Sequence, residues 1–266
     1  MLRTRVISAA VLLAIIAVPF FLGGWPFLVL IVAAGVLGAW EYSSLFRQGG
    51  AQPLTWLCIL LTVLFILEAA WSDTVPFSAV LTLAVIGSLI ATLWHKSSQP
   101  ATDWALTLAG ALYLGWLLNQ FVSLRAEPDG AYWLLLAALS IWAADVTAYF
   151  AGRAFGRHPW WPRHSPKKTW EGYVAGVAAA ALVACLIGAF LLGLSPLEGI
   201  ALGLLIGFIA PLGDLAESMI KRQVGAKDSS HLIPGHGGLL DRIDSLLITV
   251  PLVFYWAALM PRWPTI

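Results

Sequence analysis

Among the acidic side chains that lie in or beside strongly apolar stretches of the 266-residue chain, where a carboxylate is costly, five are candidates for chemistry. Asp214 and Glu217 lie three residues apart, as do Asp241 and Asp244, while Asp145 stands alone. A charged residue at the centre of a bilayer costs roughly 2.5–3.5 kcal/mol on insertion scales, so each is a candidate functional residue. Residues three apart share one face of a helix. Two helices would therefore each offer a pair of carboxylates, a ligand type that Mg²⁺ takes together with substrate phosphates.

A simpler explanation exists for Asp241 and Asp244, because they open an apolar run. The positive end of a helix dipole lies at the first turn and favours acidic residues there, so either aspartate could simply start the helix. The same explanation fails for Asp214 and Glu217. They lie in the C-terminal half of their run, where the dipole opposes a negative charge.

A polar loop at about residues 221–238 joins the two acidic runs. It carries cations suited to phosphate oxygens, and glycines whose backbone can approach a ligand closely. Its notable residues are Lys221, Arg222, Lys227, Asp228, His231, Gly235, His236, Gly237 and Gly238. The two histidines are five residues apart with no cysteine or further histidine nearby, so a zinc site is not indicated.

A second basic loop, at about residues 151–172, contains Ser165-Pro166-Lys167-Lys168-Thr169 directly before an apolar run. Two lysines and two hydroxyls at the start of a helix predict an anion site, because helix N-termini attract phosphate. The alternative is a juxtamembrane basic cluster that contacts anionic lipid or sets the topology. Thr169 could also serve only as a helix cap.

The elements that position these residues must be membrane helices. The chain is 60% hydrophobic and only 11% charged, with a mean hydropathy of +0.84, whereas soluble domains carry about 25% charged residues. This composition excludes an ordinary cytosolic enzyme and a disordered protein. The net charge of +1 offers no basic field for nucleic acid.

We predict an all-α, polytopic integral membrane protein with about nine transmembrane helices, since about 20 apolar residues span a bilayer. The runs are continuous rather than alternating, which excludes a transmembrane barrel. The predicted spans are Val6–Phe21, Phe27–Tyr42, Leu54–Trp71, Val75–Trp94, Trp104–Val122, Trp133–Phe150, Tyr173–Leu194, Gly199–Ile220 and Leu239–Met260. We expect one membrane domain over residues 1–266, with N-terminal helices in 1–130 and the catalytic helices and cytoplasmic loops in 131–266.

The distribution of basic residues predicts the orientation. With a cytoplasmic N-terminus and nine spans, 13 of the 15 Lys and Arg residues face the cytoplasm, and only Arg125 and Arg262 face the other side. Positive charge is retained on the cytoplasmic side of membrane proteins. We therefore expect the N-terminus inside, the C-terminus outside, and both polar loops in the cytoplasm.

Residues 218–244 resemble the signature of the phosphatidate cytidylyltransferase, or CDP-diacylglycerol synthase, family. That signature has the form S-x-x-K-R-x4-K-D-x-x-x-x-[LIF]-P-x-H-G-G-x-x-D-R-x-D, and this chain matches every fixed position over 27 residues. The stretch Ser165–Gly172 is also similar to that family, as is Asp145 with Tyr149 and Gly152. The resemblance covers the whole chain, with the N-terminal third alike only in character.

The resemblance implies that CTP and phosphatidic acid react to CDP-diacylglycerol and pyrophosphate, in a homodimer in the cell membrane whose active site faces the cytoplasm. It also implies Mg²⁺, with a monovalent cation such as K⁺ beside it. Asp214 and Asp241, then Asp244, are the first candidates for metal ligands, and Lys221 joins them as a catalytic candidate. Candidates for substrate binding are Ser165, Lys167, Lys168, Thr169, Ser218, Arg222, Lys227, Asp228, His236, Gly237, Gly238 and Arg242.

Two other classes remain open from the residues alone. A CDP-alcohol phosphotransferase would also be a metal-using membrane enzyme, but its D-G-x2-A-R-x8-G-x3-D-x3-D pattern is absent from the sequence. A transporter would also place carboxylates within spans, but it would not need the long loop motif, and no inverted repeat is evident.

Overall fold

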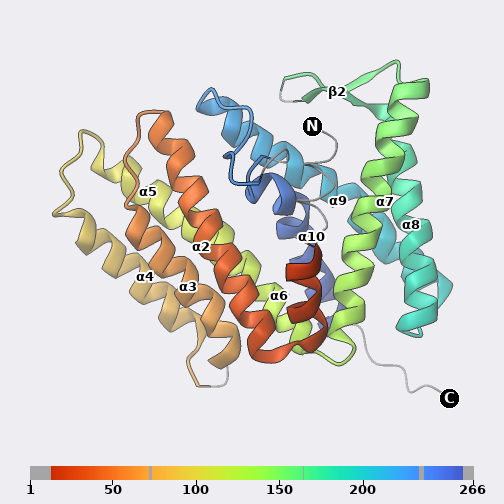
Figure 1. The fold of residues 1–266 in the computed structure, drawn as a ribbon, viewed down its shortest axis with the longest axis horizontal. Coiled ribbons are helices and arrows are strands. Elements are labelled where there is room, and N and C mark those ends of the chain that lie inside the picture. Colours follow the sequence, from red (N-terminus) through yellow and green to blue (C-terminus); the bar gives the residue numbers. More distant parts are fainter. Residues whose placement is uncertain (1–12, 72–73, 164, 234–236, 260–266) are drawn as a thin grey trace. The chain divides into compact units, whose positions relative to one another are not determined.

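The computed structural model describes residues 13–71, 74–163, 165–233 and 237–259. After a helical segment at Leu13–Leu22, helices α2 to α6 and a π-helical turn, η1, form the N-terminal part (Figure 1). Their bounds are Gly24–Gln48 (α2), Thr55–Trp71 (α3), Phe77–Thr92 (α4), Pro100–Ala111 (α5), Leu112–Trp116 (η1) and Leu117–Ala126 (α6). The remaining elements are α7 (Gly130–Phe155), β1 (Pro159–Trp161), β2 (Ser165–Thr169), α8 (Trp170–Leu191), α9 (Pro196–Gln223) and α10 (Leu240–Leu259).

The predicted all-α membrane architecture is confirmed, and each predicted span contains a helix in its described residues, although several of these helices begin later or end earlier than predicted. Within the described residues, six helices are long and apolar enough to cross a membrane, with Pro100–Ala126 counted as one span. Three apolar helices are shorter in the described residues, namely Leu13–Leu22, Thr55–Trp71 and Phe77–Thr92. Part of the first predicted span, Val6–Phe21, lies outside those residues. At 1.5 Å per residue a 16-residue helix extends only about 24 Å, less than the roughly 30 Å hydrocarbon core.

The chain divides into two compact units. The first unit comprises residues up to 126 together with residues 220–243, and the second comprises residues 127–219 and those from 244 onward. The chain passes from one unit to the other after residue 126, within α9 and within α10. The second unit begins at residue 127, and the predicted division of the chain at residue 130 stays a prediction. Most of the signature segment, however, belongs to the first unit.

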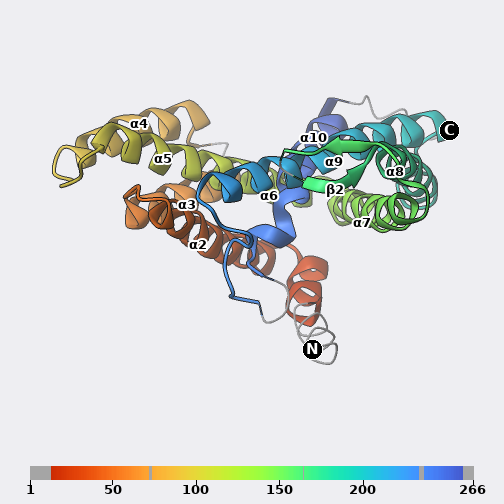
Figure 2. The ribbon, with the colours of Figure 1, turned by 90° about the horizontal axis from the view of Figure 1, so that it is seen from above.

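In the first unit α3 packs against α2, α5, η1 and α6, and α4 packs beside α5 (Figures 1 and 2). Apolar side chains fill the centre, with Leu45, Phe65 and Leu114 fully buried. Glu68, the acidic residue inside the third predicted span, accepts a hydrogen bond of 2.8 Å from Asn119 Nδ2 on α6. This contact explains how a glutamate is tolerated among apolar helices, since a buried polar group needs a hydrogen-bond partner.

The second unit is assembled through small residues that let helix backbones approach closely, as is common in membrane bundles. Along α9 every fourth residue is glycine at 199, 203 and 207, facing α8. A Cβ atom at Gly207 would lie 2.8 Å from the Cα of Val177 on α8. Further along α9, a Cβ at Gly213 would lie 2.6 Å from the carbonyl oxygen of Asp244 on α10. No larger residue fits at these positions without displacing a neighbouring helix.

The second basic loop is partly a hairpin, which the sequence did not predict. Helix α7 continues to Phe155, and β1 then pairs antiparallel with β2, with Pro159 opposite Thr169 and Trp161 opposite Ser165. Thr169 then begins α8 as its N-cap, with its Oγ1 accepting a hydrogen bond of 3.2 Å from Gly172 N. Thr169 therefore caps α8, as the alternative interpretation of this residue allowed.

Candidate active site

The first group of candidate residues lies in the second unit, around Lys168. Its Nζ lies 2.6 Å from Asp214 Oδ2 on α9, and it also donates to the carbonyl oxygen of Pro211 at 3.5 Å. Asp145 on α7 interacts electrostatically with Lys168, Asp214 and Asp244. Asp145 thus interacts with one lysine and two further carboxylates, and these four side chains together carry more negative than positive charge.

The hairpin fixes the position of Lys168. Lys167 is exposed, whereas Lys168, the next residue of the strand, is partly covered. The Lys168 ammonium lies 5.8 Å from the ring centre of Trp160 on β1. Trp160 in turn stacks on Tyr173 of α8, with 4.2 Å between ring centres and 22° between ring planes. An ammonium over an aromatic face is held by a cation–π attraction. The two neighbouring lysines thus have different environments.

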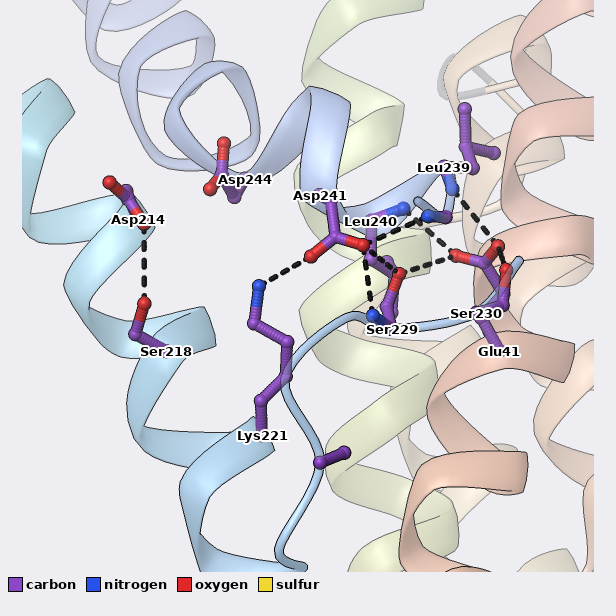
Figure 3. A network of polar contacts seen from close by, with 12 residues as sticks. Glu41, Asp214, Ser218, Lys221, Ser229, Ser230, Leu239, Leu240, Asp241 and Asp244 are labelled. Atoms are coloured by element: carbon purple, nitrogen blue, oxygen red, sulfur yellow. Dashed lines mark hydrogen bonds and ion pairs between the residues drawn. The ribbon is translucent and has the colours of Figure 1, made fainter. Parts of the chain in front are cut away.

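Asp214 and Asp244 belong to neighbouring turns of α9 and α10. The close approach at Gly213 places the α9 backbone against the backbone of Asp244 and Ser245. Asp214 Oδ1 also accepts a hydrogen bond from Ser218 Oγ one turn away on α9, at 3.3 Å (Figure 3). The Asp214 side chain remains 40% exposed. Its carboxylate can therefore still be approached by a soluble ligand.

The second group lies in the first unit and is centred on Asp241. Its Oδ1 forms an ion pair with Lys221 Nζ, and both side chains are nearly buried (Figure 3). Its Oδ2 accepts hydrogen bonds from Ser229 N and Ser229 Oγ, each at 2.8 Å, and from Gly238 N at 2.9 Å. Asp241 thus holds several groups of the loop that precedes it. These contacts go beyond what a residue that only starts a helix would make.

One buried acid in this group was missed by the sequence reasoning. Glu41 of α2 is fully buried, and its carboxylate accepts hydrogen bonds from Ser229, Ser230, Leu239 and Leu240 (Figure 3). The available signal was a single glutamate inside the predicted span 27–42. Its partners, some 190 residues away, could not be inferred from the sequence.

Most of the remaining predicted residues have exposed side chains, and the others include a half-buried serine and the glycines of the loop. Arg222 donates from Nη1 to the carbonyl oxygen of Ala226 at 3.1 Å. Arg222, Lys227, Asp228 and Arg242 are exposed, and Ser165 is half-buried at the start of β2. Gly237 has a φ of 82°, a left-handed conformation that favours glycine. His236 lies outside the residues that the structure describes.

The donor set fits a hard divalent cation that shares its ligands with a substrate. Among the described residues, no three side chains of His, Cys, Asp or Glu are grouped closely enough to hold a metal by themselves. Mg²⁺ is usually held by one or two carboxylates, with water and substrate phosphates completing its coordination. Accessible Asp214, next to the Asp244 turn, matches that pattern.

These features define a multi-pass membrane protein that carries acidic and basic side chains on its C-terminal helices and on the loops that join them. A sequence model of the cytidylyltransferase family matches residues 3–260, and the chain belongs to this family. The chain is 36% identical to a phosphatidate cytidylyltransferase of Synechocystis over 96% of both chains. It is 37% identical to one of Pseudomonas aeruginosa, over 97% of this chain and 98% of that protein. It is 31% identical to one of Bacillus subtilis, over 96% of both.

Proposed function

We propose that this protein transfers a cytidylyl group from CTP to phosphatidic acid, producing CDP-diacylglycerol and pyrophosphate for phospholipid synthesis. The observation that carries the proposal is similarity over nearly the full length to phosphatidate cytidylyltransferases. The site chemistry agrees with it. A lipid with an anionic head and a soluble nucleotide must meet where membrane helices end in polar loops.

The reaction needs charge neutralisation and alignment more than proton transfer. An oxygen of the phosphatidate phosphate forms a bond to the α-phosphorus of CTP, and the bond from that phosphorus to the β-phosphate bridging oxygen breaks. Pyrophosphate leaves with that electron pair. Because the attacking oxygen is already ionised near neutral pH, no general base is required. Phosphoryl transfer of this kind depends mainly on positioning and electrostatic stabilisation.

Enzymes of this family use a divalent metal, and we propose that the ion is Mg²⁺, with K⁺ as a second cation. Asp214 and Asp244 are proposed ligands because of the close backbone approach at Gly213. Asp241 is a further proposed ligand, one helical turn before Asp244. When bound, the ion would neutralise phosphate oxygens and polarise the α-phosphate.

The basic residues would hold the two anionic substrates. Lys168 is close to Asp214. We therefore assign Lys168 to whichever substrate phosphate binds next to the Asp214 carboxylate. Lys221, together with exposed Arg222, Lys227 and Arg242, is assigned to the other substrate. The remaining proposed contacts are those of the hydroxyl and loop residues Ser165, Thr169, Ser218, Asp228, His236, Gly237 and Gly238.

The two lysines of the hairpin give a test with an internal control. Lys168→Ala removes the cation beside Asp214, and we expect kcat/KM to fall about 10²-fold, as when an electrostatic contact to a reacting phosphate is lost. Lys167→Ala removes an exposed charge, and its effect should stay within a few-fold. Saturation curves for CTP and phosphatidic acid measure both. Equal, small effects would favour a basic cluster that only contacts lipid.

We also propose that the protein is a homodimer in the cell membrane, with both polar loops in the cytoplasm.

A topology reporter placed within residues 224–230 should report the cytoplasm, and one fused after Pro264 should report the opposite side. This expectation follows from the 13-to-2 distribution of Lys and Arg residues. Two reporters on the same side would show that the number of membrane crossings between them is even, which contradicts the nine-span topology.

Replacing the lipid substrate tests the proposed reaction. The purified protein in detergent should form a nucleotide-linked lipid from CTP and phosphatidic acid. Diacylglycerol in place of phosphatidic acid should give no product, because it lacks the attacking phosphate. Lipid product formed from diacylglycerol, or no product with phosphatidic acid under any divalent metal, would contradict the proposal.

A further inference from the structure

We propose that Glu41 of α2 is a positioning residue for the reaction. It holds the start of α10 and the described part of the loop between α9 and α10, and through them it sets the position of Asp241. The inference rests on the proposed function only where it concerns turnover. It also gives the N-terminal helices, which carry none of the predicted site residues, a defined task in the enzyme.

Glu41 is completely buried, and each of its oxygens has two donors. Oε1 accepts from Ser230 Oγ at 2.5 Å and from Leu239 N at 2.9 Å. Oε2 accepts from Ser229 Oγ at 3.2 Å and from Leu240 N at 2.9 Å. All four donors come from one short part of the chain about 190 residues away, and the dashed lines in Figure 3 trace this convergence.

Two of these donors are backbone amides at the first turn of α10. The carbonyl oxygen of Leu239 accepts the first hydrogen bonds of that helix, from Arg242 N and Ile243 N. The amides of Leu239 and Leu240 therefore have no partner within the helix. Glu41 supplies that partner from another helix, and its negative charge is favoured by the helix dipole. The start of α10 is thus fixed relative to α2 within the first unit.

The contacts continue from Glu41 to Asp241 through Ser229. The Ser229 hydroxyl lies 3.2 Å from Glu41 Oε2 and 2.8 Å from Asp241 Oδ2, and its single proton can be donated to one of the two carboxylates at a time. Gly238 lies against the same groups, because a Cβ there would overlap Ser229 Oγ and lie 2.7 Å from Glu41 Oε1. The Gly238 amide also donates to Asp241. Displacement of Glu41 would therefore move two of the groups that hold Asp241.

A glutamate is chemically required for this arrangement. Glutamine has the same shape, but its amide nitrogen donates and cannot accept. In Glu41→Gln, either orientation of the side-chain amide directs N–H groups at a backbone N–H of Leu239 or Leu240. A hydroxyl could rotate to accommodate the change, whereas a backbone amide cannot. At least one buried donor is then left unpaired, and the loop should loosen.

Glu68→Gln is the matched control. Glu68 is also a nearly buried glutamate of the first unit, but its hydrogen bond comes from Asn119 on α6 and not from the loop. Ser230→Ala is a milder variant that removes one donor to Glu41 and leaves both α10 amides paired. It keeps the test informative if Glu41→Gln fails to fold.

The experiment combines hydrogen exchange with kinetics on purified full-length protein in detergent. Without substrate, Glu41→Gln should raise amide exchange at least tenfold in peptides covering 226–233 and 237–243, and leave α3 and α6 peptides unchanged. Its kcat should fall about 10- to 100-fold, the usual effect of losing a group that orients a metal ligand. The half-saturating Mg²⁺ concentration should rise. Ser230→Ala should show the same changes at a few-fold level.

Each readout can contradict the proposal separately. Unchanged exchange in both loop peptides of Glu41→Gln, or of Ser230→Ala if the former does not fold, would overturn the anchoring role whatever the activity. Raised exchange with unchanged kcat and Mg²⁺ dependence would overturn the positioning role. Equal effects of Glu68→Gln on the loop peptides would show general loosening of the first unit. A wild-type protein without transferase activity would refute the proposed function but leave the exchange test intact.

Discussion

Asp214→Asn should abolish nearly all turnover while leaving the protein folded. Asparagine preserves the size of the side chain, and with its Oδ1 toward Lys168 its amide nitrogen can donate to the rotatable Ser218 hydroxyl. The negative charge that attracts a divalent cation is lost. We expect kcat to fall about 10³-fold, at the upper end for one electrostatic contact in an active site. The side chain of Lys168 is 27% exposed and that of Asp214 is 40% exposed. Loss of this ion pair should therefore lower the stability of the protein by no more than about 1 kcal/mol.

Glu198→Gln is the matched control for this variant. Glu198 lies on the same helix, at its start, where it accepts hydrogen bonds from Ser195 N at 2.8 Å and Ser195 Oγ at 2.7 Å. This variant should keep normal turnover. Turnover against Mg²⁺ concentration, with thermal melting in parallel, measures both proteins. If Asp214→Asn retained near-normal turnover with unchanged Mg²⁺ dependence, Asp214 would not be a metal ligand.

Asp241→Asn should lose activity to a similar degree, and it should also lose stability. The ion pair with Lys221 is nearly buried, with side-chain exposures of 8% and 10%. An amide at position 241 must direct its N–H groups either at the Lys221 ammonium or at the donors of Ser229 and Gly238. Removing one partner of a buried pair typically costs about 3–5 kcal/mol. We therefore expect a clearly lower melting temperature, in contrast to Asp214→Asn.

The double variant Asp241→Asn with Lys221→Gln separates the two effects. Replacing Lys221 removes the buried ammonium that has lost its counter-charge, so part of the stability should return. Activity should not return, because the carboxylate is still missing. An Asp241→Asn protein with near-normal turnover would remove Asp241 from the site and leave it as a residue that only organises the loop.

Hydropathy and the cost of buried charge predicted most of the architecture. Long apolar runs predicted helices because only helices and closed barrels satisfy the backbone within a bilayer. The acids at 145, 214, 241 and 244 were identified because each interrupts or opens such a run. The family was predicted from residues 218–244, since a loop with so many fixed positions constrains the chemistry more than composition does.

Contacts between distant segments could not be predicted in the same way. Glu41 was visible as a charge within a span, but its donors at 229, 230, 239 and 240 depend on how α2 packs against the loop. Strands as short as those at 159–161 and 165–169 carry little periodic signal, and each contains a proline. The different environments of Lys167 and Lys168 follow from that hairpin. Because the hairpin was not predicted, the sequence offered no reason to assign the two lysines different roles.

The fate of each phosphate of CTP tests the central claim most directly. Purified protein is incubated with phosphatidic acid, Mg²⁺ and CTP labelled with ³²P at either the α- or the γ-position, and the lipid fraction is counted. Cytidylyl transfer predicts that the α-label enters the lipid in step with pyrophosphate release, and that the γ-label appears only in pyrophosphate. Transfer of the γ-label to lipid, or no transfer of either label at any Mg²⁺ concentration, would contradict the account.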